Sequence, residues 1–381
     1  MRHILTADQI TLEMLDRLHG LTNAIRKKRQ TREGAIWLKQ CFPHRRAEIY
    51  FSQKSSRTKQ SFISACQNLG MDVIVLDDPS TSSEGKGESK FDSHRTFSSF
   101  VDLIIMRTKT QGLAARIASH LDGTERPRPV INGGSGADQH PTQAMLDDYT
   151  LRRSLKERGG IPGKKIALVG DLKRGRTVRS LAPLMRFYKG ASLILVSPPE
   201  FAMLPDVTDK LEEYGIEYSV TDDFDKAVAD CDALYLTRVQ DEHDDVTSKI
   251  PISIGGVEYT VDTMDASDPE CVVLRLKPNG KALKKLEPDE CAGSSVPGYS
   301  FEPRHLGLLG SNAIVMHPLP RRGELDPACD TDPRIKIWRA VRNGMHVRTA
   351  LVYRILKEQE LEKEWGGPLP KHMQDRCWLL R

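Results

Sequence analysis

Hydrophobic residues recur at helical spacing close to the start of the chain. Ile10, Met14 and Leu18 follow one another at intervals of four, and Thr6 and Gln9 before them have the spacing of a capping box. An apolar face with this period, preceded by a capping signal, predicts an amphipathic first helix.

Short apolar segments then alternate with polar segments. Strands are predicted at residues 47–51, 71–76, 101–106 and 129–132, and helices are predicted to start at Ser55 and near Gln143. The compact apolar run 71–76 favours a buried strand. Residues 79–93 are rich in Ser, Gly and Lys without a hydrophobic period, so a loop is expected there. Strands that alternate with helices indicate a parallel sheet of the α/β class.

A Gly- and Pro-rich segment at residues 159–163 is the best candidate for a domain boundary. A second series of strands is predicted after it, at residues 165–169, 192–196, 217–220, 233–237 and 313–316. Residues 250–310 interrupt this series and predict an insertion with small β elements. Residues 335–360 predict one or two final helices, with a possible break at Asn343 and Gly344.

Composition agrees with a folded chain of two domains. The 381 residues are too many for one ordinary domain. The hydrophobic share is 39%, and with the 28 Gly added and the 9 Tyr left out it is about 44%, near the globular average. Lys and Arg number 56 against 52 Asp and Glu, a balance too even to predict a nucleic-acid-binding protein. The apolar runs are far shorter than the roughly 20 residues of a membrane span, and the polar N-terminus predicts neither a signal nor an anchor. A cytoplasmic location is therefore expected.

The motifs of several common enzyme classes are missing from the sequence. Neither GxxxxGK[ST] nor a GxGxxG after a strand occurs, so the usual nucleotide sites lack support. HExxH, CxxC and GxSxG are missing too, and the seven cysteines are odd in number. A metal site, a disulfide framework and a serine nucleophile are therefore not expected.

Two predicted helix starts carry groups suited to anionic substrates. Residues 55–58, Ser-Ser-Arg-Thr, place hydroxyls and a guanidinium at a helix N-terminus, where free N–H groups and the helix dipole favour an anion. His140 can donate a hydrogen bond to a developing oxyanion, and Gln143 offers an amide carbonyl. Each segment alone is more often an ordinary helix cap or a solvated side chain.

Further polar groups follow the predicted strands. They are Arg107, Arg176, Arg238 and the segment 317–320, His-Pro-Leu-Pro. Open α/β sheets bind ligands at the carboxyl ends of their strands. Arginines that converge on one crevice predict a small substrate pair with several negative charges.

Together these segments resemble the aspartate/ornithine carbamoyltransferase family. Ser-x-Arg-Thr, Lys-Gly-Glu, the strand-end Arg, HPTQ, GDLKxGRT, TRVQ and HPLPR occur in this order between Ser55 and Arg321. The resemblance runs from the first helix to about Leu356 and is interrupted at residues 250–310. It is stronger to the aspartate-using members, because the Ser-Met-Gly and His-Cys-Leu-Pro elements of the ornithine enzymes are missing.

The resemblance implies two doubly wound parallel-sheet domains of the α/β class, with the active site in the crevice between them. Residues 1–150 would bind carbamoyl phosphate, and residues 151–335 would bind aspartate and carry an insertion at about 250–310. Helices at about 336–365 would pack back on the first domain. The implied reaction is carbamoyl transfer from carbamoyl phosphate to the α-amine of L-aspartate, for pyrimidine biosynthesis, in a homotrimer with shared active sites.

The resemblance also implies roles for individual residues. Carbamoyl phosphate would be bound by Ser55, Ser56, Arg57, Thr58, Arg107, His140, Gln143, Pro318, Leu319 and Pro320. Of these, Arg57, Thr58, Arg107 and His140 would be catalytic. Aspartate would be bound by Lys86, Arg176, Arg238 and Gln240, with Ser82 and Lys86 supplied by a neighbouring subunit. Neither a metal nor a cofactor is implied, since orientation and oxyanion stabilisation would lower the barrier.

The sequence departs from the family pattern at three points, of which His243 and the insertion leave another substrate open. Ser56 replaces the usual Thr, His243 stands where many members have an Arg, and residues 250–310 are inserted in the region that moves on closure. One alternative is a carbamoyltransferase for another amino acid or a ureido compound. The other is a catalytically silent paralogue with an assembly or regulatory role.

Overall fold

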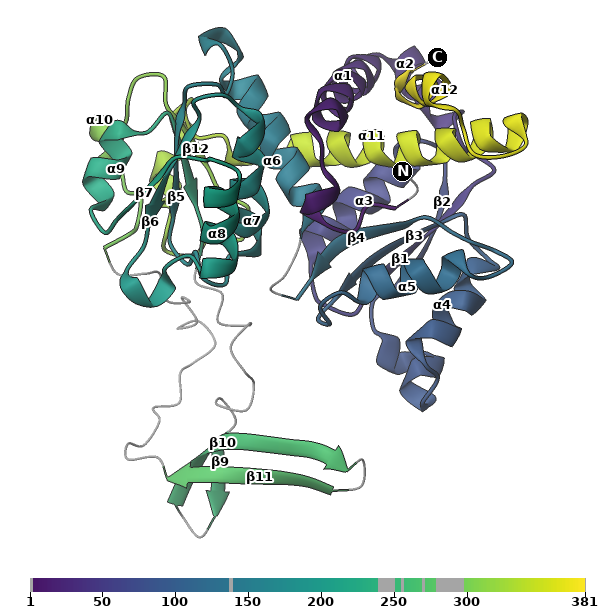
Figure 1. Cartoon of the computed structure of the whole chain (residues 1–381), viewed down its shortest axis with the longest axis horizontal. Coiled ribbons are helices and arrows are strands. Elements are labelled where there is room, and N and C mark those ends of the chain that lie inside the picture. The colour runs from purple at the N-terminus through teal and green to yellow at the C-terminus, as the bar shows by residue number, and fades with distance from the viewer. Residues whose placement is uncertain are drawn as a thin grey trace.

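The chain folds into two α/β lobes, each built around a parallel sheet (Figure 1). The computed structural model describes residues 3–136, 140–238, 251–254, 257–268, 271–278 and 298–380. The two-lobed parallel-sheet fold predicted from the sequence is confirmed.

The first lobe has a four-stranded parallel sheet in the order β2-β1-β3-β4. Its strands are β1 (Arg46–Phe51), β2 (Asp72–Leu76), β3 (Leu103–Thr108) and β4 (Val130–Ser135). Its helices are α1 (Leu12–Lys28), α2 (Arg32–Lys39), α3 (Ser56–Asn68), α4 (Lys90–Ser98), α5 (Leu113–Asp122) and α6 (Pro141–Ser154). Phe51 pairs with Arg107 in the parallel register, so β1 and β3 end at the same edge of the sheet.

The second lobe has a five-stranded parallel sheet in the order β12-β8-β5-β6-β7. Its strands are β5 (Lys165–Val169), β6 (Ser192–Val196), β7 (Tyr218–Thr221), β8 (Ala233–Leu236) and β12 (Ile314–Met316). Its helices are α7 (Arg176–Leu181), α8 (Pro205–Glu213), α9 (Phe224–Asp230) and α10 (His305–Leu308). The order reverses beside β5, and such reversals are where open α/β sheets bind ligands.

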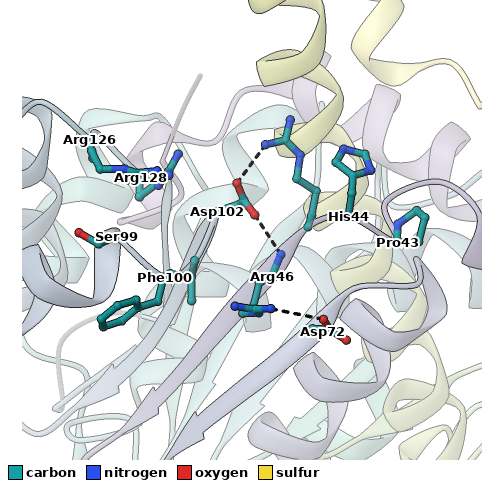
Figure 2. Close-up of a pocket in the computed structure, with 11 residues that line it drawn as sticks. Pro43, His44, Arg46, Asp72, Ser99, Phe100, Asp102, Arg126 and Arg128 are labelled. Carbon is teal, nitrogen blue, oxygen red and sulfur yellow. Dashed lines mark hydrogen bonds and ion pairs between the residues drawn. The ribbon is translucent and has the colours of Figure 1, made fainter.

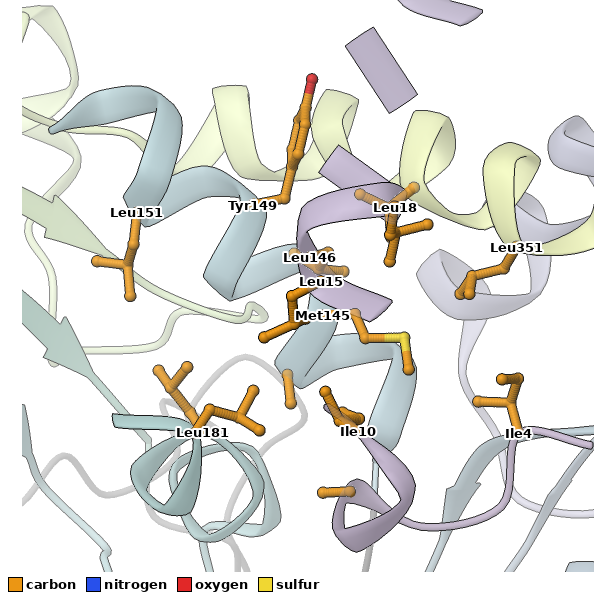
Figure 3. Packing of buried hydrophobic residues seen from close by; sticks show 14 of the residues in the cluster. Ile4, Ile10, Leu15, Leu18, Met145, Leu146, Tyr149, Leu151, Leu181 and Leu351 are labelled. Carbon is orange, nitrogen blue, oxygen red and sulfur yellow. The ribbon is translucent and has the colours of Figure 1, made fainter. Parts of the chain in front are cut away.

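An apolar core joins the two lobes. The last long helix, α11 (Ile337–Trp365), starts at Ile337 in the core of the second lobe and packs along α1, α3 and α6 of the first. Figure 3 shows Leu181 of the second lobe near Met145 of α6, with Leu351 of α11 close by. The short helix α12 (Lys371–Gln374) follows α11. The shared core fixes how the carboxyl ends of the two sheets face each other.

The first amphipathic helix begins later than the sequence signal predicted. Gln9 accepts a hydrogen bond from the backbone N–H of Thr6 at 3.1 Å, but this box caps only a 3-10 turn, Ala7–Gln9. The helix itself begins after Thr11, whose side chain accepts from the Met14 N–H at 3.2 Å. The predicted apolar face is confirmed, since Leu18 is buried with its neighbours.

The predictions for residues 71–93 were partly wrong. β2 is an edge strand rather than a buried one, and Ile74 and Val75 are each 43% exposed. The expected loop contains two 3-10 turns, Pro79–Thr81 and Ser83–Lys86, and ends where α4 starts. An apolar run alone does not reveal whether a strand has neighbours on both sides.

The final helix has no break at Asn343 and Gly344. Asn343 Nδ2 donates to the Thr150 hydroxyl at 3.0 Å. A Cβ at Gly344 would lie 3.1 Å from the Leu146 side chain, so the glycine permits close approach to α6. These two residues serve helix packing rather than helix termination.

The β elements predicted in the insertion are confirmed. They are β9 (Pro251–Ile254), β10 (Val257–Asp268) and β11 (Cys271–Pro278), which form a separate antiparallel sheet in the order β11-β10-β9. The C-terminal part of the predicted insertion is instead part of the second lobe, because Tyr299, Phe301 and Leu309 belong to the core of that lobe.

Candidate functional site

A cavity of about 1160 Å³ lies between the two lobes, at the carboxyl ends of both sheets. The predicted site residues that line it are Ser55, Ser56, Arg57, Thr58, Arg107, His140, Gln143, Arg176, Arg238, Pro318, Leu319 and Pro320. Among the described residues, its lining holds eight Lys or Arg side chains and neither Asp nor Glu. Such an unbalanced positive charge suits small, multiply charged anions.

The N-terminus of α3 forms one wall of this cavity. Ser55 precedes the helix and its side chain makes no capping hydrogen bond, while Thr58 is buried in the first turn. The pKa of Arg57 is lowered by burial and, second, by Arg238 of the other lobe. Two guanidiniums that repel each other across the cavity, beside a helix N-terminus, favour a bound anion such as phosphate.

Arg107 reaches the cavity from the end of β3. It is 5% exposed, and its Nη1 donates to the carbonyl of Gly133 at 3.1 Å. Gly134 has a φ of 120°, and a Cβ there would lie 2.7 Å from the same Nη1. The glycine at this position near the end of β4 is thus required by the position of Arg107.

His140 lies immediately before α6 and is 3% exposed. Its pKa is held well below the usual value, first by burial and then by Arg107, Arg176 and Arg348. The imidazole is therefore neutral at neutral pH, and a neutral imidazole can donate one hydrogen bond to a developing oxyanion.

The second lobe contributes a contact across the cavity. Arg176, the first residue of α7, donates through Nη1 to Gln53 Oε1 at 3.2 Å and to the Gly136 carbonyl at 2.5 Å. Arg238 follows β8, after Thr237, and lines the same cavity. Both arginines can therefore face a ligand that is held by the first lobe.

The segment after β12 has an unusual backbone. Leu319 has a φ of 56°, in the left-handed region that costs energy for a residue with a side chain. Its N–H donates to His317 Nδ1 at 2.8 Å, and His317 Nε2 lies 2.7 Å from Glu324. These bonds hold residues 318–320 against the cavity.

The loop predicted to serve a neighbouring subunit does not line this cavity. Lys86 is exposed and is the last residue of the 3-10 turn Ser83–Lys86, and Ser82 directly precedes this turn. Neither residue lines the cavity. The loop is held to its own lobe by Tyr50, whose hydroxyl donates to Glu84 at 2.9 Å. Gln240 and His243 lie outside the described residues.

Several residues that line the cavity were not indicated by the sequence motifs. Lys54, Lys109 and Arg322 line the cavity, and each lies within two residues of a recognised motif residue. Their closeness in sequence to Ser55, Arg107 and Pro320 could have indicated that they belong to the site. Arg348 gave none, because it comes from the middle of α11; it donates to Ser61 at 2.8 Å.

A second hollow of about 420 Å³ lies at the amino ends of β1, β2 and β3 (Figure 2). Arg45 donates to Asp102 at 3.0 Å, and Arg46 lies 3.7 Å from Asp72. Because carboxylates oppose these guanidiniums, the hollow is the weaker candidate for an anionic substrate.

The described residues contain no group of three or more His, Cys, Asp or Glu residues arranged to hold a metal ion. Within the same part of the chain, no helix has the length and apolar character needed to cross a membrane.

Comparison with known proteins places the chain in a family. Residues 2–153 match the family described as aspartate/ornithine carbamoyltransferase, carbamoyl-P binding domain, and residues 162–282 and 284–355 match its Asp/Orn binding domain. The aspartate carbamoyltransferase catalytic subunit of Methanopyrus kandleri is 37% identical over 81% of this chain and 84% of its own. That of Cellvibrio japonicus is 33% identical over 93% and 92%.

A solved structure agrees with these sequence relatives. Aspartate transcarbamoylase from Trypanosoma cruzi, in complex with carbamoyl aspartate and phosphate, is 28% identical. It superposes with a TM-score of 0.71 over 92% of this chain and 94% of that one. This chain therefore belongs to the aspartate/ornithine carbamoyltransferase family.

Proposed function

We propose that this protein transfers the carbamoyl group of carbamoyl phosphate to the α-amine of L-aspartate, giving N-carbamoyl-L-aspartate and phosphate. One observation carries the proposal. Both lobes contribute arginines to the cavity, and the described residues that line it include neither Asp nor Glu. The related enzyme from Trypanosoma cruzi is described in complex with both of these products.

The first lobe would bind carbamoyl phosphate. Its phosphate would lie at the N-terminus of α3, against Ser55, Ser56 and Arg57, with Arg107 closing on it. Thr58, Arg107 and His140 would face the carbonyl oxygen, where negative charge develops. Gln143 and the segment 318–320 would hold the carbamoyl NH₂. Preorganised donors of this kind each lower the barrier by about 3 kcal/mol.

The second lobe would bind aspartate through its two carboxylates. Arg176 and Arg238 would contact them, with Gln240 and with Lys86 of a neighbouring subunit. The deprotonated amine then attacks the carbonyl carbon and a C–N bond forms. The C–O bond to phosphate breaks, its electron pair leaves with the phosphate, and the phosphate accepts the amine proton. Orientation and charge stabilisation suffice for this sequence of steps.

We further propose a cytoplasmic homotrimer that serves pyrimidine biosynthesis. Ser82 and Lys86 lie on an exposed loop outside their own cavity, which is the arrangement that a site shared between subunits needs.

The test is a colorimetric ureido assay with carbamoyl phosphate and a panel of amines. We expect product with aspartate and none with ornithine, because two arginines match a dicarboxylate. Faster turnover of ornithine or putrescine would favour the alternative substrate. A protein that binds carbamoyl phosphate but forms no ureido product with any amine would be the silent paralogue.

Arg57→Ala supplies the internal control of that assay. Turnover should fall about 100-fold or more, because a charge-assisted contact to the leaving phosphate is lost. Arg126→Ala is the matched variant, since Arg126 is an exposed arginine outside the cavity, and it should retain normal turnover. Near-normal turnover of Arg57→Ala would refute the assignment of the phosphate site.

A further inference from the structure

A buried chain of hydrogen bonds lies behind the cavity wall. Gln143 Nε2 donates to the two carboxylate oxygens of Asp147 at 3.1 and 3.2 Å. The Tyr235 hydroxyl donates to Asp147 Oδ2 at 2.7 Å. Gln143 lines the cavity, whereas Asp147 and Tyr235 do not.

The two lobes both contribute to this chain. Gln143 and Asp147 are one turn apart on α6, so their side chains lie on the same face of the helix. Tyr235 comes from β8, two residues before Thr237 and three before Arg238, which line the cavity. Asp147 is 1% exposed. Its carboxylate is held from two directions, because Gln143 of α6 and Tyr235 of β8 both donate to it.

The chemistry of a carboxylate decides how the Gln143 amide is oriented. An ionised carboxylate only accepts hydrogen bonds, so it fixes the NH₂ end of the amide against Asp147. The amide oxygen then remains as the end that a ligand in the cavity can approach. A carbamoyl NH₂ is a donor and needs such an acceptor.

Burial of Asp147, in contrast, favours the protonated form of its carboxyl group. It raises the pKa of this carboxyl to about 7, while the bonds from Tyr235 and Gln143 oppose the rise. A protonated Asp147 would carry an O–H donor and could bond the amide oxygen instead of the amide NH₂. The hydroxyl of Tyr235 thus helps to keep Asp147 an acceptor.

We propose that Asp147 is a positioning residue that turns the Gln143 amide oxygen toward the cavity and so selects carbamoyl phosphate over acyl phosphates without an NH₂. The proposal rests on the proposed function, because it assigns the recognition of one group of that substrate. Asp147 acts through Gln143 and does not touch the substrate.

The test compares carbamoyl phosphate with acetyl phosphate, which carries a methyl group in place of NH₂. Dissociation constants of both are measured by calorimetry for the wild type and for Asp147→Asn. Asparagine keeps the shape but offers both a donor and an acceptor, so it no longer dictates the orientation of the Gln143 amide. We expect the preference for carbamoyl phosphate to fall about tenfold, mainly through weaker carbamoyl phosphate binding.

Two further variants separate positioning from a structural role. Tyr235→Phe removes one donor to Asp147 without changing α6, and a smaller loss of the same preference is expected. Asp148→Asn is the matched control, because Asp148 is equally buried on α6 but bonds Arg152 and Tyr188 instead. It should lower the melting temperature and leave the preference unchanged.

The outcomes are distinguishable. A preference that stays unchanged in Asp147→Asn, or in Tyr235→Phe if the first variant does not fold, would overturn the proposal. An equal loss in Asp148→Asn would also overturn it, because the effect would then be structural. If the wild type binds both phosphates but makes no carbamoyl aspartate, the proposed function fails instead.

Discussion

At the scale of single residues, burial and neighbouring charges decide whether an ionisable side chain of the cavity is charged or neutral. Three arginines and the surrounding protein oppose the protonation of His140. The lowered pKa means that the imidazole stays neutral in the folded protein where an exposed histidine, with a pKa of about 6.5, would begin to protonate. A neutral donor keeps its function across the physiological pH range.

The neutral state of His140 predicts how the turnover of His140→Ala depends on pH. Turnover should fall by about 100-fold, because one donor to the oxyanion is lost. The factor should be the same at every pH from 6 to 8.5, since His140 does not titrate there. The measurement is a set of kcat profiles for the wild type, His140→Ala and the exposed-histidine control His44→Ala. An acid limb that is present in the wild type and lost in His140→Ala would contradict it.

At the scale of elements, the β9–β11 sheet is separate from the sheets that carry the site. Its described strands pair only with each other in the backbone ladder. The chain re-enters the second lobe with Phe301, which is fully buried. A core residue so close to an insertion limits how much of the insertion can be removed.

Replacing residues 251–278 with a short Gly/Ser linker should leave the melting temperature and the oligomeric state unchanged. The reason is that a shorter surface connection changes the closure entropy only slightly. A second deletion, of residues 251–303, also removes Tyr299 and Phe301 and should destabilise the lobe by about 3 kcal/mol or more. Thermal melting and light scattering measure both. Aggregation of the shorter deletion would show that the sheet is part of an interface or of the core.

At the scale of the whole molecule, the lobes share one core while the Lys86 loop lies outside its own cavity. We expect the complete site of the proposed enzyme to include a second subunit, with Arg57 and Lys86 from different chains. A cyclic trimer gives every cavity such a neighbour.

Complementation between two inactive proteins tests this arrangement. Homotrimers of Lys86→Ala and of Arg57→Ala should both be nearly inactive. After reversible dissociation and equal mixing, about a quarter of the sites are wholly native, because each side is drawn independently. Activity should return to about that fraction of wild type. A mixture verified as hybrid by native mass spectrometry that stays inactive would refute the shared site, and an active Lys86→Ala homotrimer would do so directly.

The sequence by itself determined the α/β class, most strand positions and a large part of the candidate site. Hydrophobic periodicity is local, so it indicates strands and helices before any tertiary contact is known. Residues 55–58, Arg107 and His140 were found because each directly follows or starts a predicted element. The parallel topology then places such residues at one edge.

Only the tertiary structure decided which distant residues meet and which surfaces are covered. Arg348 reaches the cavity because α11 packs against α3 and α6, and Tyr235 meets Asp147 because the lobes share a core. The exposure of β2 and the unbroken course of α11 through Gly344 also depend on neighbours remote in sequence. Burial and long-range contact are properties of the packed chain, so no local pattern encodes them.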